Sequence, residues 1–250
     1  RRGLAQGLGF GAATVGVAGF GLAVRNAVQS FGDFQQSLQR MVGLSGVAQK
    51  AISGLRNDVL ALAPSVGKGP QELADALFFI TSSGIPAARA LDVLTVSAKA
   101  SAAGLGETQV VADAVTSALN AYGPAVLSAS QATDVLVATV REGKGEADQF
   151  AGVIGNVAAI AAELGVGFDQ VGAALAAQTR LGTDAETAAT QLNQVFNAFL
   201  NTSPQVAKAF ESVGLNLNDL RRTLRERGLL AALTQVKEGF GNNTVALRQA

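Results

Sequence analysis

The chain has 250 residues, of which 48% are hydrophobic, 15% charged and 5% aromatic, and it is rich in Ala (47) and Gly (29). It contains neither Cys nor His, which excludes a thiol nucleophile, a disulfide framework, a His-ligated metal and an imidazole general base. Lys plus Arg and Asp plus Glu are 19 each, so the summed charge supplies no global field that attracts DNA or an anionic membrane.

The first thirty residues form an apolar segment with regularly spaced small residues. No charge occurs from Gly3 to Val24, and as a helix at about 1.5 Å per residue this stretch would be roughly 33 Å long, close to the ~30 Å core of a bilayer. Its many glycines weaken a helix in water, by about 1 kcal/mol each relative to Ala. We expect a helix that either lies in a membrane or packs in a bundle. Small residues that allow close helix packing are Gly3, Gly7, Gly11, Ala12 and Gly16.

From residue 31 onward, apolar residues recur at intervals of three and four, which places them on one side of a helix. Strict alternation of apolar and polar residues is scarce, and no Asn-Gly or Asp-Gly hairpin turn occurs. The pattern predicts an all-α fold, in which a multi-helix domain of short helices follows the long apolar Gly/Ala-rich helix. The periodic residues are Phe31, Phe34, Leu38 and Met41; Leu55, Val59 and Leu62; Leu73, Leu77 and Ile80; and Val171, Ala174 and Leu175.

Gly and Pro interrupt the helical pattern at short intervals. After several of these breaks the next helix begins with an acid, which complements the positive end of the helix dipole. The sequence therefore predicts helices of roughly three to five turns joined by short loops from about residue 47. The helix starts with an early acid are Pro70-Gln71-Glu72, Gly106-Glu107-Thr108 and Thr183-Asp184-Ala185-Glu186.

The patterns divide the chain into three segments. Residues 1–30 are the apolar segment, residues 31–240 the helical domain, and residues 241–250 the start of a further segment. Because the chain begins with Arg1 and its single Met is Met41, we expect a piece of a longer protein.

Two stretches of the helical domain resemble each other although they lie far apart in the chain. The first runs from Gln71 to Leu77 and ends at Gly84, and the second runs from Asp169 to Leu175 and ends at Gly182. A duplicated helical unit and a chance similarity between Ala-rich helices both explain the resemblance.

Glycine patterns that resemble nucleotide-binding loops are better explained as structure. Gly7-Leu8-Gly9-Phe10-Gly11-Ala12 fits a loose dinucleotide pattern, but only six residues precede it, too few for the strand that this pattern requires. Gly67-Lys68-Gly69 and Gly143-Lys144-Gly145 lack the Lys-Ser/Thr continuation of a phosphate loop. We predict that both are turns with a solvated Lys.

The charged candidates also have structural explanations. The acid pairs Glu142/Glu146 and Asp184/Glu186 could serve hydrolysis, but they lie beside turns and helix starts, where acids are expected. The basic run from Arg221 to Arg227 could contact phosphates, although the acids interspersed with it favour a solvated helix face. We predict no catalytic, cofactor-binding or metal-binding residue, and therefore not an enzyme.

Several blocks, in this order, resemble the phage tail tape-measure protein family over about residues 31–240. The family's blocks are individually degenerate, but their order and spacing together are specific. The clearest runs from Leu181 to Asn193, and a Pro-containing step at Thr202-Ser203-Pro204 and the segment from Val213 to Leu220 follow it. Upstream blocks are Gln71-Glu72-Leu73-Ala74, Ser83-Gly84-Ile85-Pro86, Ala132-Thr133-Asp134-Val135-Leu136 and Ala162-Glu163-Leu164-Gly165-Val166.

The resemblance implies a virion structural protein without a cofactor, in the tail tube lumen or at the tail tip of a long-tailed phage. Such a protein sets tail length during assembly, leaves ahead of the DNA during genome ejection and aids passage through the host envelope. The implied partners are tail tube and tail-tip proteins, tail assembly chaperones, further copies of the chain in the lumen, and a host membrane. DNA is a neighbour that is not bound sequence-specifically.

Two other classes of protein compete with this interpretation. The first is a pore-forming or membrane-remodelling helical protein; the second apolar stretch, Gln149 to Ala162, is too short to span a bilayer and argues against an inserted hairpin. The second is an enzyme domain such as a peptidoglycan hydrolase, for which the sequence offers little support.

Overall fold

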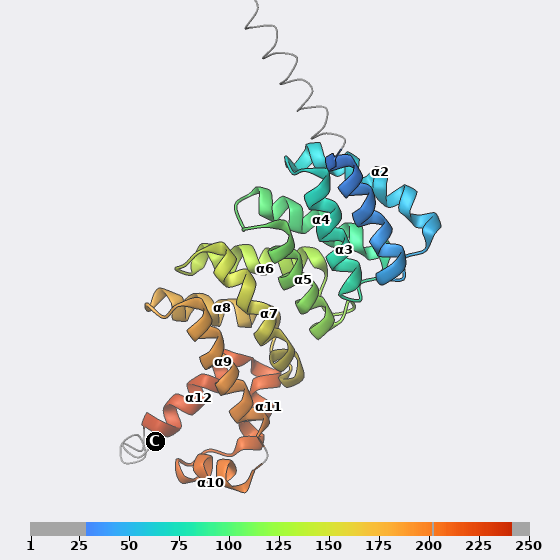
Figure 1. Ribbon diagram of the computed structural model, residues 1–250. Coiled ribbons are helices and arrows are strands. Elements are labelled where there is room, and N and C mark those ends of the chain that lie inside the picture. The colour runs from blue at the N-terminus through green and yellow to red at the C-terminus, as the bar shows by residue number, and fades with distance from the viewer. Residues whose placement is uncertain (1–28, 202, 242–250) are drawn as a thin grey trace, which may run out of the picture.

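The computed structural model describes residues 29–201 and 203–241, and this part of the chain is helical without a strand (Figure 1). The all-α prediction is confirmed, whereas the predicted apolar helix of residues 1–30 lies almost wholly outside the described residues. Residues 29–44 form the first described helix. It is followed by α2 (Gln49–Val66), α3 (Pro70–Ser82), α4 (Ala87–Ala102), α5 (Thr108–Tyr122), α6 (Ala129–Glu142), α7 (Ala147–Leu164), α8 (Phe168–Arg180), α9 (Ala185–Leu200), α10 (Pro204–Ser212), α11 (Leu217–Arg227) and α12 (Leu229–Gly241).

Local sequence explains where these helices begin and end. Pro70 opens α3, where its missing N–H costs nothing because the first N–H groups of a helix have no internal partner. Ser128 and Gln131 form a reciprocal capping box at the start of α6. Gly67 and Gly165 end α2 and α7 in the left-handed conformation that glycine adopts without strain. The predicted short helices and short loops are therefore confirmed.

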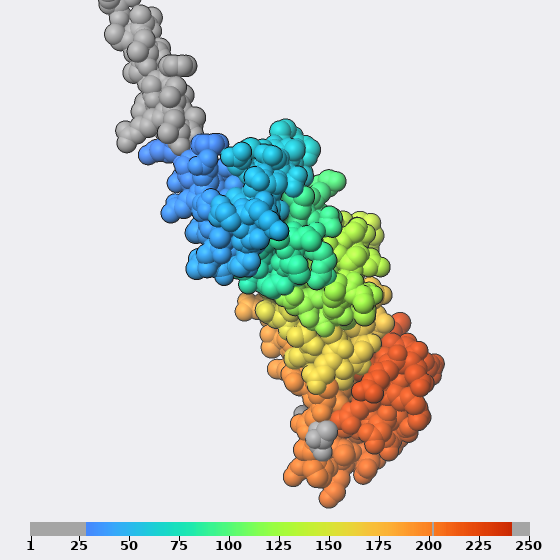
Figure 2. Space-filling view, turned by 90° about the vertical axis from the view of Figure 1, so that its right-hand side faces the viewer, coloured from blue at the N-terminus to red at the C-terminus, as the bar shows by residue number. Residues whose placement is uncertain are grey.

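The helices stack in two rows. The odd row consists of α3, α5, α7 and α9, each of which contacts the next, and the even row consists of α2, α4, α6 and α8, which do the same. Each helix from α3 to α9 also packs on its neighbour in the chain. Figure 1 shows the rows side by side, and Figure 2 shows an elongated body along which the chain order is kept. This is the arrangement of an α-solenoid, in which each unit contacts mainly its neighbours.

The stack repeats at a nearly constant interval along the chain. In the odd row, α3 begins at Pro70, α5 at Thr108, α7 at Ala147 and α9 at Ala185, so successive starts are almost equally spaced. The interval lies within the range of lengths known for solenoid repeats. The resemblance between residues 71–84 and 169–182 relates α3 of the odd row to α8 of the even row. It is therefore not the structural repeat, and a duplicated unit with that spacing is wrong.

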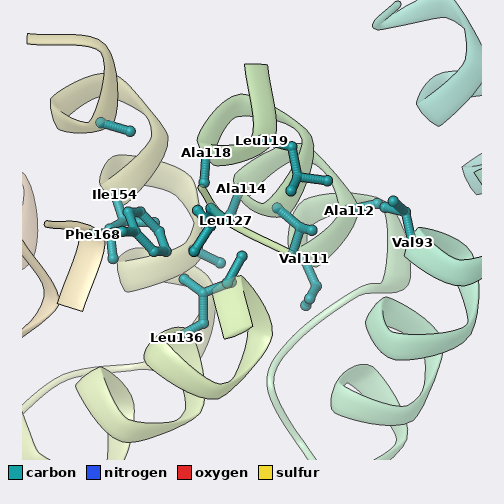
Figure 3. Packing of buried hydrophobic residues seen from close by; sticks show 14 of the residues in the cluster. Val93, Val111, Ala112, Ala114, Ala118, Leu119, Leu127, Leu136, Ile154 and Phe168 are labelled. Atoms are coloured by element: carbon teal, nitrogen blue, oxygen red, sulfur yellow. The ribbon is translucent and has the colours of Figure 1, made fainter. Parts of the chain in front are cut away.

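One hydrophobic core runs through the stack. Figure 3 shows its centre, where Val111 and Ala114 of α5 lie among Val93 of α4, Leu136 of α6 and Ile154 of α7. Most of the periodic residues named in the sequence belong to this core. Of the periodic residues in the sequence, Phe31 is the clear exception at 53% exposure, and Leu62 and Ala174 are only partly buried.

Small residues allow the helices within a row to approach closely. A Cβ added to Gly155 of α7 would lie 2.9 Å from the Cβ of Ser117 in α5. A Cβ added to Gly172 of α8 would collide with the Thr139 hydroxyl of α6 and lie 2.9 Å from Val135 Cγ1. The abundance of small residues is thus partly a requirement of row packing.

The last three helices depart from the two rows. The short helix α10 contains no buried residue, α11 packs against α7 and α9, and α12 packs against α11. The start of α12 is tied to the even row, because the Leu229 N–H donates a 2.6 Å hydrogen bond to the Gln170 side-chain oxygen of α8. Within residues 29–201 and 203–241, the C-terminal helices therefore pack at the end of the odd row, while Ala173 and Ala177 of α8 stay exposed.

Candidate interaction surface

The five predicted helix-packing residues lie outside the described residues, as does the loose dinucleotide pattern. They are Gly3, Gly7, Gly11, Ala12 and Gly16, and their packing role remains a prediction.

The two Gly-Lys-Gly segments are turns, as predicted. Gly67 ends α2 and Gly69 precedes α3, while Lys68 forms an ion pair of 3.2 Å with Glu72 instead of being only solvated. In the second segment Gly143 ends α6, and the Lys144 N–H donates a 3.1 Å hydrogen bond to the Thr179 hydroxyl of α8. Both segments therefore serve helix junctions.

The predicted acid pairs also have structural roles. Glu142 forms ion pairs with Arg141 at 2.9 Å and with Arg180 at 3.7 Å, which links the ends of α6 and α8. Glu146 caps α7. Asp184 caps α9 by accepting a 2.8 Å hydrogen bond from the Thr187 N–H, and this bond lowers the pKa of the Asp184 carboxyl.

The basic run is partly a structural anchor. Arg221 donates to the Phe199 carbonyl at 2.6 Å and to the Asn201 carbonyl at 3.0 Å, so it satisfies carbonyls at the end of α9. Arg222 pairs with Asp219 at 2.7 Å on the exposed surface. The predicted solvated helix face therefore describes Arg222 but not Arg221, whose role depends on a contact 22 residues away in the sequence.

Overall neutrality hides a strong segregation of charge. Residues 103–201 contain three Lys or Arg and ten Asp or Glu, a net charge of −7, so the rest of the chain carries +7. The helices α5, α7 and α9 contain no Lys or Arg at all. The outward side of these helices is acidic and rich in amides, through residues such as Asp113, Asn156, Glu163 and Gln194. We call this side the odd face.

The even row presents a different surface. The helices α4, α6 and α8 of this row each expose an acid in the first half and a base in the last turn, with small or β-branched residues between them, whereas α2 has no base in its last turn. Three grooves lie along this side. The first, of about 450 Å³, lies between α4 and the start of α6, and the second, of about 320 Å³, lies between α6 and α8. The third, of about 420 Å³, lies between α8 and the neighbouring α9 and α12. We call this side the even face; its charged residues are Asp92 and Lys99, Asp134 and Arg141, and Asp169 and Arg180.

Comparison with known proteins identifies the family. The family described as phage-related minor tail protein matches residues 56–250, more than three quarters of the chain. The chain belongs to this family. The "Probable tape measure protein" of Clostridium phage phiCD119 is 28% identical over 183 residues, which cover 72% of this chain and 19% of the relative. The "Tape measure protein" of Pneumococcus phage Dp-1 is 20% identical over 216 residues, which cover 85% of this chain and 18% of the relative.

The predicted resemblance to tape-measure proteins is thus confirmed. This minor tail protein chain spans about a fifth of the length of the two curated relatives. No solved structure matches it. Among the helices within residues 29–241 that the structure describes, none has both the length and the apolar character needed to cross a bilayer.

Proposed function

We propose that the chain is a folded part of a tape-measure protein and acts as a structural component of the phage tail. The family match over residues 56–250, together with two curated relatives called tape measure proteins, carries this proposal. The complete protein sets tail length during assembly, in contact with tail tube and tail-tip proteins and with tail assembly chaperones. It lies in the tail tube lumen or at the tail tip.

Within that protein, this chain is a folded module and not the extended ruler. A continuous helix gains about 1.5 Å for each residue, so the residues of one repeat would contribute roughly 57 Å of length. A stacked helix pair adds only about one interaxial distance, roughly 10 Å, along the stack. The two-row packing of α3 to α9 supports the second geometry.

The proposal is tested by deleting one repeat, residues 108–146, from the complete protein in its phage. The deletion joins Glu107, which occupies the N-cap position of α5, to Ala147, so a Glu again precedes α7 as Glu146 does. Electron microscopy of tails should show a change of no more than about 10 Å. Deletion of an equally long stretch from the part that acts as a ruler should shorten the tail by far more. Tail lengths that do not respond to either deletion would contradict a measuring role.

We propose further that the chain leaves the tail ahead of DNA. The acidic odd face supports this, because exposed carboxylates repel phosphates, and the acids of α5, α7 and α9 form no ion pair within residues 29–201 and 203–241. Ejection triggered in vitro should release the protein before DNA becomes accessible to nuclease. Retention of the protein in emptied tails would contradict release.

We propose a structural and not a catalytic role for this part of the chain. Three of the four acids that could serve hydrolysis are used at helix caps or in ion pairs, namely Glu146, Asp184 and Glu142. The purified chain should leave a peptidoglycan gel uncleared, and clearing would contradict the proposal.

A second candidate function is contact with a host membrane during passage through the envelope. The charge-free stretch from Gly3 to Val24 in the sequence supports it. A peptide of these residues should release dye from liposomes, and replacement of Gly7 and Gly11 by Leu should alter that release. The absence of release from both peptides would leave only a packing role for the segment.

A further inference from the structure

The even face carries the same charge pattern on three successive helices. Asp92 and Lys99 lie on α4, Asp134 and Arg141 on α6, and Asp169 and Arg180 on α8, and all six side chains are exposed. Because these helices belong to one row, the acids follow one edge of the even face and the bases follow the opposite edge.

Helix dipoles explain only half of this pattern. The three bases lie in the last turns of their helices, where the dipole favours a positive charge. Of the acids, only Asp169 lies in a first turn, whereas Asp92 and Asp134 are each the sixth residue of their helix. The dipole acts mainly within the first turn, so the line of acids needs another explanation.

The strip between the two charged edges consists of small or weakly polar side chains. On α8 it consists of Ala173 and Ala177, both exposed, which also line the grooves on either side of that helix. On α6 it includes Val137, which is 40% exposed. A surface with an apolar centre and a charged rim has the anatomy of a protein–protein interface.

The pattern has the symmetry that a pair of identical chains requires. On each helix, the point halfway along the chain between the acid and the base lies near the middle of the helix. These midpoints are residues 95–96 on α4, 137–138 on α6 and 174–175 on α8. A two-fold axis that runs along the row over these midpoints sets each helix antiparallel to its counterpart. Each acid then faces the base of the second copy, as an isologous interface demands.

We propose that the even face is the surface through which a second copy of this chain binds, with α6 and α8 antiparallel to α6 and α8 of that copy. Ala173 and Ala177 allow the α8 helices to approach closely, and the acidic and basic edges fix the register. The axis leaves both stacks pointing in the same direction, so the two copies lie parallel along their length. The inference does not rest on a role in tail length.

Two charges oppose the pattern without removing it. Arg89 lies on the exposed surface of α4 at the acidic edge, and Glu142 lies at the basic edge, where it is shared between Arg141 and Arg180. Each edge therefore keeps two net charges, and the two edges remain opposite in sign. Because exposed ion pairs are weak and screened by salt, the pair should dissociate as ionic strength rises.

The first test reverses charges in the 250-residue chain and follows association by analytical ultracentrifugation at low salt. Asp169→Arg and Arg180→Asp should each raise the dissociation constant by roughly tenfold or more, since each change makes two contacts repulsive. The combined variant Asp169→Arg/Arg180→Asp should restore association, because the two-fold axis pairs the exchanged charges again. Asp113→Arg makes the same charge change on the odd face and should leave association unchanged.

The second test determines the direction of pairing and uses the absence of Cys from the chain. Chains with Asp169→Cys and chains with Arg180→Cys should form a disulfide when mixed and oxidised, whereas each alone should not. In the antiparallel pair, like positions lie about 16 Å apart along the helix axis, beyond the reach of a disulfide.

Three results would overturn the proposal. They are a monomer at every concentration, a pair that Asp169→Arg does not weaken, and a double variant that stays monomeric while its circular dichroism and melting temperature match those of the unaltered chain. A preference for disulfides between like positions would equally overturn the antiparallel arrangement. Each result leaves the test of tail length by electron microscopy unaffected.

Discussion

The Tyr122 hydroxyl at the end of α5 donates a hydrogen bond of 2.8 Å to the backbone carbonyl of Val166, 44 residues further along the chain. Val166 lies in the loop between α7 and α8, and the Tyr122 ring packs edge-on against Phe168 at 5.8 Å between centroids. Tyr122 thus links the end of α5 to the loop between α7 and α8. Tyr122 is the single Tyr of the chain, and the helical pattern of apolar residues in the sequence does not reveal its hydrogen bond.

Tyr122→Phe should lower the free energy of unfolding by about 1 kcal/mol, because the ring remains while a partly buried hydrogen bond is lost. Chemical denaturation at neutral pH would measure the change. A variant as stable as the unaltered chain would show that water replaces the hydroxyl at no cost.

The same side chain predicts a dependence on alkaline pH. Burial, with a smaller contribution from the charge of Asp169, raises the pKa of Tyr122 above its usual value of about 10. The neutral phenol therefore stabilises the fold fully below pH ~10, and this contribution is lost as the pH rises toward the folded pKa. Between neutral pH and pH ~11, the unaltered chain should lose more stability than Tyr122→Phe. Parallel losses in the two proteins would contradict this assignment.

Two glycines of α7 offer a matched test of row packing. Gly152 has open space where a Cβ would be placed, so Gly152→Ala should stabilise the chain by up to about 1 kcal/mol through helix propensity. Gly155 faces Ser117 of α5, so Gly155→Ala should be less stable than Gly152→Ala by about 1–3 kcal/mol, as the two helices must separate. Thermal unfolding of both variants measures the difference, and equal melting temperatures would contradict close packing at Gly155.

The sequence was sufficient for the helices and for much of the core, because both follow from local periodicity. Leu73, Leu77 and Ile80 are fully buried as predicted. The stacking order was not predictable in the same way. It depends on contacts between residues far apart in the chain, such as Gly172 with Thr139, and a Gly in an Ala-rich helix carries no signal of what it faces. The similarity between residues 71–84 and 169–182 was misleading because odd and even helices share one amphipathic pattern.

The interaction surface was hidden by the overall neutrality of the chain. A net charge of zero describes the chain as a whole, and it concealed the net charge of −7 on residues 103–201. The acid and the base on each of α4, α6 and α8 lie two or three helical turns apart, and equivalent charges on successive helices are separated by a whole repeat. Only the stacking of α4, α6 and α8 shows that they form two edges.

Arg221 and Arg222 are neighbours with different expected roles. Arg221→Ala should cost about 1–3 kcal/mol, because charged donors to the Phe199 and Asn201 carbonyls are lost at the end of α9. Arg222→Ala removes an exposed ion pair with Asp219 and should cost at most about 0.5 kcal/mol. Urea unfolding of the two variants provides the comparison. If Arg222→Ala proved the more damaging, the assignment of Arg221 as the anchor of α9 would be wrong.

Asp184 predicts a dependence on acidic pH. Its carboxylate accepts the Thr187 N–H at the start of α9, and this bond lowers the pKa of Asp184 below its usual value near 4. A lowered pKa means that the stabilisation is complete above the usual value and is lost as the pH falls through the folded value. Asp184→Asn keeps a cap oxygen but removes the titration, so its melting temperature should fall less between pH ~7 and pH ~3 than that of the unaltered chain. Glu186→Gln serves as the control, since it changes the same charge within the first turn of α9 without touching the cap. An acid response that is lost in Glu186→Gln but kept in Asp184→Asn would assign the titration to the helix dipole instead of the cap.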